Sequence, residues 1–135
     1  MKTRIEIKSA YYGKVLFSYE KENNSLKDTV IEAMSQGVGL SNADFRGADL
    51  RGVDLSSYDF SFCDFSGADL TSANLFESKV HDSFFRGATL CDANLSNADF
   101  HDSDFRGAIL CDSDLTFANL EGVDFSGADL TGCSF

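Results

Sequence analysis

The sequence predicts an all-β solenoid, a four-sided β-helix of about five coils with an N-terminal cap made of a β-hairpin and a short helix. The first observation is a four-residue motif, FRGA or FSGA, that begins every twenty positions, at Phe45, Phe65, Phe85, Phe105 and Phe125. The second is that every fifth residue from Leu40 to Phe135 is large and apolar. A single helix or strand has a period of about 3.6 or 2.0 residues. A spacing of twenty therefore indicates repeats that bury their apolar residues by stacking.

Residues 1–37 predict the cap. Apolar residues alternate with other residues at Ile5 and Ile7, and again over residues 15–19, on either side of a turn near Gly13. This pattern is typical of a β-hairpin. The hairpin and the helix after it are expected to cover the first coil, because the open end of a solenoid exposes unpaired strand edges. The alternative is that this segment contacts a partner.

A short amphipathic helix is expected after the hairpin. Ser25 is its N-cap, Asp28 follows three residues later, and Gly37 lies beyond its end. Its apolar face consists of Leu26, Val30, Ala33 and Met34.

Residues 38–135 predict the β-helix. In nearly every group of five, the large central residue and a small residue two before it point inward, as with Phe45 and Ala43; Tyr58 is the clear exception to the small residue. The other three residues face water or form turns. Four groups complete one square coil, so residues twenty apart stack on one another. The column that begins with Gly47 marks one corner that requires a positive φ, which glycine adopts without steric cost.

The groups ADFRG, ADLRG, ADLTS, ANLSN, ADFHD and ANLEG closely resemble the pentapeptide-repeat family. The resemblance covers residues 38–135 and implies a right-handed quadrilateral β-helix. Some members of that family protect type II topoisomerases from quinolones by imitating DNA, and others have no known activity. Quinolone-resistance members often carry projecting loops, whereas the five-residue register here never slips.

The cysteines fall into two groups. Cys63 and Cys133 occupy the small inward position, where a free thiol packs as a small apolar group. Cys91 and Cys111 are twenty residues apart and should stack outward on adjacent coils. A disulfide between them is geometrically conceivable. We expect two free surface thiols instead, because a cytoplasmic chain rarely keeps a disulfide.

His81 and His101 form a second stacked pair, and each precedes an Asp. They lie half a coil from the outward cysteines, so a tetrahedral site of nitrogen and sulfur ligands cannot form. We expect no metal and no cofactor; a surface site of the two histidines with Asp82 or Asp102 is the weaker alternative, since no third strong ligand is fixed. No nucleophile elbow or phosphate-binding loop is present either, and the protein is expected to be a non-enzyme.

The coils are acidic, with five Lys or Arg against seventeen Asp or Glu, whereas residues 1–37 carry six against five. Coils spaced roughly 4.8 Å apart give a rod with about one net negative charge per 2 Å, close to the density of duplex DNA. This favours a DNA mimic that occupies the DNA-binding groove of an enzyme such as a type II topoisomerase. The residues expected at that contact are Asp44, Asp64, Asp104 and Asp124. However, an Asp before the central residue also makes local turn bonds, so such a coil is acidic whatever its function.

The alternative function is a generic protein-binding scaffold. The third coil carries Lys79, Phe84 and Arg86 where the other coils are more acidic, and Phe62 and Phe76 also fall at outward positions. Exposed aromatic residues beside an Arg are typical of interface anchors. We expect a protein partner and no direct binding of nucleic acid.

No apolar run is long enough to span a membrane, and the first residues lack the apolar core of a signal peptide, so a cytoplasmic location is expected. Nothing polar follows Phe135 to cover the last coil. A bare strand edge with an apolar core behind it is a template for pairing. We therefore expect an end-to-end homodimer through Leu120, Phe125, Leu130 and Phe135. The alternative is a longer natural chain whose continuation covers the last coil.

Overall fold

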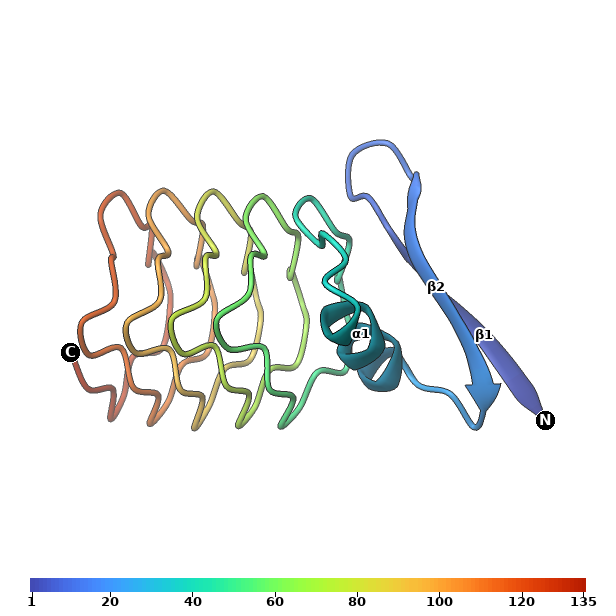
Figure 1. The fold of residues 1–135 in the computed structure, drawn as a ribbon. Helices are drawn as coiled ribbons and strands as arrows, with labels where there is room; N and C mark the ends of the chain where they lie inside the picture. The colour runs from blue at the N-terminus through green and yellow to red at the C-terminus, as the bar shows by residue number, and fades with distance from the viewer.

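The computed structural model describes all residues, 1–135. The chain begins with strands β1 (Lys2–Lys8) and β2 (Val15–Glu22) and helix α1 (Leu26–Ser35). From there to the C-terminus it winds into a stack of coils, with the helix and the hairpin at one end of the stack (Figure 1). No helix has both the length and the apolar composition needed to cross a membrane.

Strands β1 and β2 form the antiparallel hairpin predicted from the alternating apolar residues. Ile5 lies opposite Tyr19 and Ile7 opposite Phe17. The register then shifts after Ile7, so Val15 lies opposite an exposed lysine and is 44% exposed, whereas Ile7 is buried. This bulge is why the alternation of apolar residues does not bury Val15.

Helix α1 has the predicted ends and the predicted apolar face. The Ser25 side chain accepts a hydrogen bond from the backbone N–H of Asp28 at 3.1 Å, and Gly37 beyond the helix has a φ of 68°. Val30 and Ala33 are fully buried. Leu26 and Met34 are partly buried against the same apolar core. The helix therefore shares one core with the coils.

Each coil pairs with the next through parallel backbone contacts between residues twenty apart. These run without interruption from the pair Asp44 and Asp64 to the pair Asp114 and Ser134. The N–H of Phe45 donates to Asp64 at 2.8 Å, and the N–H of Asp64 donates back to Ala43 at 3.0 Å. Because every coil repeats this exchange, side chains in one column are held directly above one another.

The central residues form four buried columns, one on each side of the coil, as the spacing predicted. Each of these side chains is at most 2% exposed. The first side contains Leu40, Phe60, Val80 and Phe100, the second Phe45, Phe65, Phe85 and Phe105, the third Leu50, Leu70, Leu90 and Leu110, and the fourth Leu55, Leu75, Leu95 and Leu115.

A positive φ occurs at every corner of the coil, and not only in the glycine column. Gly47 and its column equivalents have φ values of 65–70°, as predicted. The residue two after each central residue has the same conformation on the other three sides, including Phe62 at 60° and Phe117 at 59°. Bulky residues rarely adopt this region, because the Cβ atom crowds the backbone.

Cys91 and Cys111 form a disulfide, so the prediction of two free surface thiols was wrong. Stacking on adjacent coils brings their Cα atoms to 4.6 Å, within the range that a disulfide spans. Free thiols were expected because a cytoplasmic location was assumed, and that assumption has no bearing on the distance between the two cysteines. Cys63 is a free thiol and buried, as expected; Cys133 is also free and partly buried.

Candidate functional site

The four acidic residues predicted to contact a partner lie in one column on the second side, and each is held by its own turn. The N–H of Arg46 donates to Asp44, and that of Arg106 to Asp104, both at 3.1 Å. Asp64 and Asp124 accept the equivalent bond. The same contact is made by each Asp or Asn at this position in the other columns. These carboxylates therefore stabilise the coil.

Three arginines on the second side offset most of the charge of these carboxylates. Arg46 pairs with Asp44 at 2.8 Å, and Arg106 pairs with Asp104 at 2.7 Å. Arg106 also lies 3.8 Å from Asp124. Hydrogen bonds from Arg106 hold the pKa of the Asp104 carboxyl well below its usual range, and Arg86 contributes to the same shift. The second side is consequently almost neutral.

Arg86 differs from the other two arginines because Phe84 replaces the Asp two residues before it. With no carboxylate there, the Arg86 guanidinium lies 5.2 Å from the centre of the Phe84 ring and forms its ion pair with Asp104 in the next coil. Phe84 is half-buried. The Arg86 cation therefore lies over the Phe84 ring, and its ion pair with Asp104 holds it there.

The corner between the first and second sides carries a row of aromatic rings. Phe62 is 43% exposed and meets the ring of His81 edge-on, with the ring centres 5.4 Å apart. The ring of His81 in turn stacks on that of His101 at 4.6 Å. Tyr11 extends the row, because its hydroxyl donates to the Phe62 carbonyl at 3.1 Å.

Sequence reasoning missed Tyr11. The hairpin bends onto the coil where the N–H of Ala10 donates to the carbonyl of Asn42 at 2.7 Å, and this contact brings Tyr11 to the corner. The repeat carries no information about the hairpin's position. The only available signal was the pair of tyrosines at the turn, Tyr11 and Tyr12.

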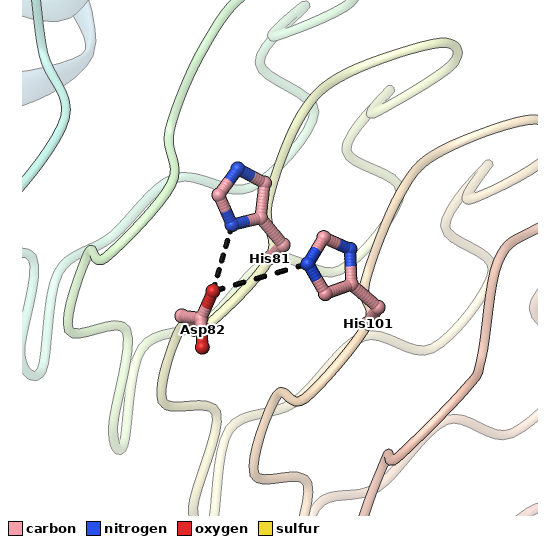
Figure 2. A group of neighbouring side chains, drawn as sticks. All are labelled: His81, Asp82 and His101. Carbon is pink, nitrogen blue, oxygen red and sulfur yellow. Dashed lines mark hydrogen bonds and ion pairs between the residues drawn. The ribbon is translucent and has the colours of Figure 1, made fainter.

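Asp82 lies beside both histidines of this corner (Figure 2). Its Oδ2 atom is 2.8 Å from Nδ1 of His81 and 4.0 Å from Nε2 of His101. His101 uses its other ring nitrogen, Nδ1, to contact Oδ1 of Asp99 at 2.7 Å. This hydrogen bond raises the pKa of His101. Sequence reasoning had found no fixed third ligand, whereas the structure provides one in Asp82.

Two predicted contact residues lie apart from these rings. Lys79 is exposed on the first side, two residues before His81. Phe76 is half-buried at the corner that follows the fourth side, one corner before the corner that carries His81. We call Tyr11, Phe62 and His81 at this corner, together with Phe84 and Arg86 on the adjoining second side, the corner patch; Phe76 is not part of it.

The residues predicted to form a dimer contact lie in the last coil, and they are more exposed than their counterparts. Leu120, Phe125 and Leu130 are only partly buried, and Phe135 is 67% exposed. In earlier coils the same columns are at most 2% exposed. The end of the stack therefore presents apolar side chains.

The structure contains no pocket that could enclose a small molecule. What it offers is an outer surface, with the corner patch on one edge and apolar side chains at one end.

A family model described as pentapeptide repeats matches the chain in eight copies, over residues 40–75, 73–112 and 98–135. No curated protein matches the chain in sequence. Among solved structures, the chain is similar to HetL, a pentapeptide repeat protein involved in heterocyst differentiation regulation from the cyanobacterium Nostoc sp. strain PCC 7120. The identity is 29% and the TM-score 0.67, over 72% of this chain and 46% of HetL. The chain thus spans about half the length of HetL.

Two further structures are more distant in shape. Rfr23, a pentapeptide repeat protein from the cyanobacterium Cyanothece 51142, has 21% identity and a TM-score of 0.47, over 82% of this chain and 95% of Rfr23. QnrB1, a plasmid-mediated fluoroquinolone resistance protein, has 25% identity and a TM-score of 0.37, over 67% of this chain and 59% of QnrB1.

Proposed function

Because the chain belongs to the pentapeptide-repeat family, whose members fold as right-handed quadrilateral β-helices, we propose that it is a non-enzymatic module that binds a protein partner through the corner patch. The observation that carries this proposal is the pair Phe84 and Arg86. Where other coils place an Asp that holds its own turn, Phe84 can accept no such bond, and a net hydrogen bond of about 1 kcal/mol is absent there. The coil itself gains little from a half-exposed ring, whereas a binding surface gains an aromatic anchor with an adjacent Arg.

A second feature supports the same surface. Phe62 is exposed and has a φ of 60° at a corner where most equivalent positions have Gly, Asn, Asp or Ser; Glu77 and Phe117 are the other exceptions. A phenylalanine in that conformation is strained, since its Cβ crowds the backbone. Strain of this kind at an exposed aromatic residue is typical of a site kept for binding.

In this proposal residues 38–135 form five coils, and residues 1–37 act as the cap. The N–H of Asp44 donates to the carbonyl of Lys8 at 2.8 Å, so the hairpin satisfies part of the edge of the first coil. Val30 of the helix is fully buried against the same end. Covering of a terminal repeat in this way protects a solenoid from edge pairing.

The second candidate is a DNA mimic whose partner is a DNA-handling enzyme such as a type II topoisomerase. The observation that favours it is the charge of the coils, seventeen Asp or Glu against five Lys or Arg. Against it, the acidic column on the second side is bound to turns and to arginines. The two candidates predict different effects of one substitution on partner binding. Replacing Phe84 with Asp removes the anchor of the patch, which weakens binding in the first candidate, and adds a negative charge, which a DNA mimic tolerates.

We expect Phe84→Asp to weaken partner binding at least tenfold, because loss of an interface anchor costs about 2 kcal/mol or more. The substitution restores the residue that the same column has at Asp64 and Asp104, so the fold is retained. The measurement is quantitative capture of proteins from lysate on wild-type and variant baits, followed by titration of the retained protein. Phe76→Ser is the matched control, since it also restores the residue of its column, Ser56 and Ser96, and should leave binding unchanged.

The DNA mimic makes the opposite prediction. Binding should then survive Phe84→Asp, fall steeply with salt because separated exposed charges are screened, and appear as inhibition of gyrase supercoiling at low salt. Retention that survives Phe84→Asp but is lost at moderate salt would replace the patch proposal with the mimic. A bait that retains no protein under either condition would contradict both.

We also propose that the last coil forms an end-to-end homodimer through Leu120, Phe125, Leu130 and Phe135. Replacing Phe135 with Asp should then yield a monomer, because each copy would bury an unpaired carboxylate. Light scattering over a range of concentrations measures the mass. Phe117→Asp is the control: Phe117 is 88% exposed, but it lies at a lateral corner, so this change should leave the mass unaltered. A wild-type protein that remains monomeric at high concentration would rule the dimer out.

A further inference from the structure

The two stacked histidines and the aspartate beside them form a cluster of three ligand groups. One atom from each of His81, Asp82 and His101 lies within 4.8 Å of the others (Figure 2). The histidines come from adjacent coils, in one column, and their rings are inclined by only 9°. The backbone contacts between coils fix this column, so the cluster is a product of the fold.

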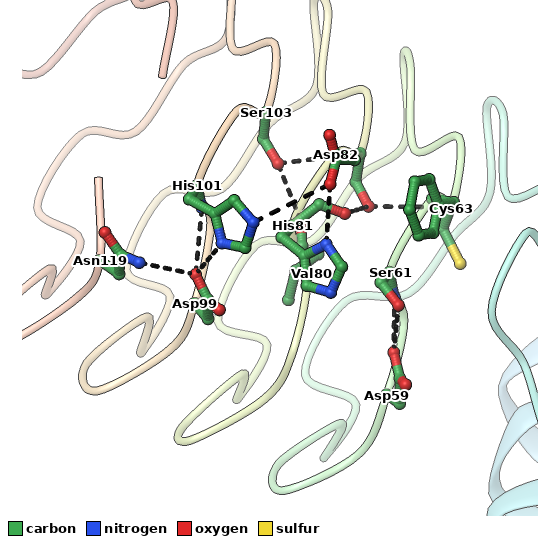
Figure 3. Close-up of polar contacts among 12 residues, drawn as sticks. Asp59, Ser61, Cys63, Val80, His81, Asp82, Asp99, His101, Ser103 and Asn119 are labelled. Atoms are coloured by element: carbon green, nitrogen blue, oxygen red, sulfur yellow. Dashed lines mark hydrogen bonds and ion pairs between the residues drawn. The ribbon is translucent and has the colours of Figure 1, made fainter. Parts of the chain in front are cut away.

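The orientation of the His101 ring is set by Asp99 and Asn119 on its Nδ1 side (Figure 3). Oδ1 of Asp99 lies 2.7 Å from Nδ1 of His101 and also accepts the N–H of His101 at 3.2 Å. The side-chain amide of Asn119, in the next coil, donates to the same oxygen at 3.1 Å. A carboxylate at Nδ1 keeps the ring proton on that nitrogen, so Nε2 is free to bind a cation on the side of Asp82.

Asp82 is positioned to share a cation with both rings. Its distances to the two imidazole nitrogens are 2.8 and 4.0 Å. Ligand atoms about 2.0–2.2 Å from a Zn²⁺ ion are separated from one another by about 3–4 Å. Because the lone pair of an imidazole nitrogen lies in the ring plane, at least one of the two stacked rings must rotate about its Cβ–Cγ bond to share an ion with Asp82, and the proton on Nδ1 of His81 must move to Nε2 or to water.

We propose that His81, Asp82 and His101 bind one divalent transition-metal ion, with Zn²⁺ as the expected species. Two imidazole nitrogens and one carboxylate oxygen form a ligand set that zinc accepts, and water completes the coordination because all three side chains are partly exposed. Asp99 acts as a positioning residue, since it contacts His101 and not the ion. The site lies beside Phe62, on the corner patch, but it does not depend on the proposed partner.

The test is calorimetric titration of the full-length, non-reduced protein with ZnCl₂ alone. We expect one ion per chain, and at least tenfold weaker binding for His81→Ser and for Asp82→Asn. Serine is what the same column has at Ser61, and asparagine suits the positive φ of Asp82. The matched control is Asp92→Asn, which removes a carboxylate from another corner of the same coil that has the same backbone conformation and should not change the affinity.

Two further variants separate this site from other sources of binding. Asp99→Asn should weaken Zn²⁺ binding about tenfold to a hundredfold, the usual effect of losing a carboxylate behind a ligating histidine. Cys133→Ser tests the partly exposed free thiol and should bind like the wild type. NMR provides the second readout: the ring signals of both histidines should shift together on addition of Zn²⁺. A wild-type chain that takes up no Zn²⁺, or affinity unchanged in His81→Ser and Asp82→Asn, would overturn the proposal.

Discussion

Replacing Phe85 with Ala is expected to lower the free energy of unfolding by about 3–5 kcal/mol, the range for emptying a buried Phe site. Phe85 is fully buried. Its ring stacks between Phe65 at 4.9 Å and Phe105 at 4.4 Å, and it meets Phe100 at 5.9 Å. Alanine at this position would therefore remove contacts in three directions at once.

The surrounding coils have little freedom to collapse into the resulting cavity. The N–H of Phe85 donates to Asp104 in the next coil at 2.7 Å, and the carbonyl of Phe84 accepts from Phe65 in the previous coil at 2.7 Å. These bonds hold the spacing between coils regardless of what fills the interior. A cavity that cannot relax places the cost toward the upper end of the range.

Urea denaturation of the wild type and of Phe85→Ala measures the loss in the free energy of unfolding. Phe84→Ala is the matched control, because Phe84 is the adjacent residue of the same type, points outward and is half-buried. Its loss should be well below that of Phe85→Ala. Equal losses for the two variants would mean that the assignment of inward and outward positions is wrong.

The buried columns could be predicted because a strict spacing of five residues determines them. Once Phe85 was assigned inward, the positions of Phe65 and Phe105 followed from the spacing of twenty. Glycines in the FRGA motif likewise predicted one corner correctly. The other three corners adopt the same conformation, in part with Asp and Asn residues that favour a positive φ, but also with Phe62 and Glu77, which no propensity argument places there.

The candidate sites depend on which side chains pair across coils, and the spacing alone does not determine this. Arg86 pairs with Asp104 of the next coil, as Arg46 and Arg106 approach the Asp of theirs, but Phe84 leaves it no carboxylate in its own turn. Asp82 lies beside His81 and His101, and the spacing of the repeat does not encode the side-chain direction that places it there. Tyr11 arrives from the hairpin, which lies outside the repeat. Sequence reasoning found Phe62 and Phe84 as exceptions to the repeat, with Arg86 beside Phe84, and His81 as one of a stacked pair, but it could not assign their partners.

The disulfide shows how an assumption about the cell overrode a correct structural argument. The spacing of twenty had already placed Cys91 and Cys111 on adjacent coils, close enough to be bridged. The assumed cytoplasmic location then excluded a bond that the geometry permits. Because the bond closes a loop of one complete coil, its contribution to stability can be calculated from the chain alone.

Removal of this disulfide is expected to lower the free energy of unfolding by about 3 kcal/mol, the value for closing a loop of roughly twenty residues in the unfolded chain. The variant is Cys91→Thr with Cys111→Thr, because the same column has threonine at Thr71 and Thr131 and the fold should accept it.

Thermal melting with and without a reductant isolates the effect of the bond. Reductant should lower the melting temperature of the wild type to that of the double variant, and it should leave the variant unchanged, because the two remaining cysteines form no disulfide. Alkylation before reduction is the independent check: it should modify at most Cys63 and Cys133. If all four cysteines are alkylated in the protein purified under oxidising conditions, the bond does not form, and the outward pair is two free thiols after all.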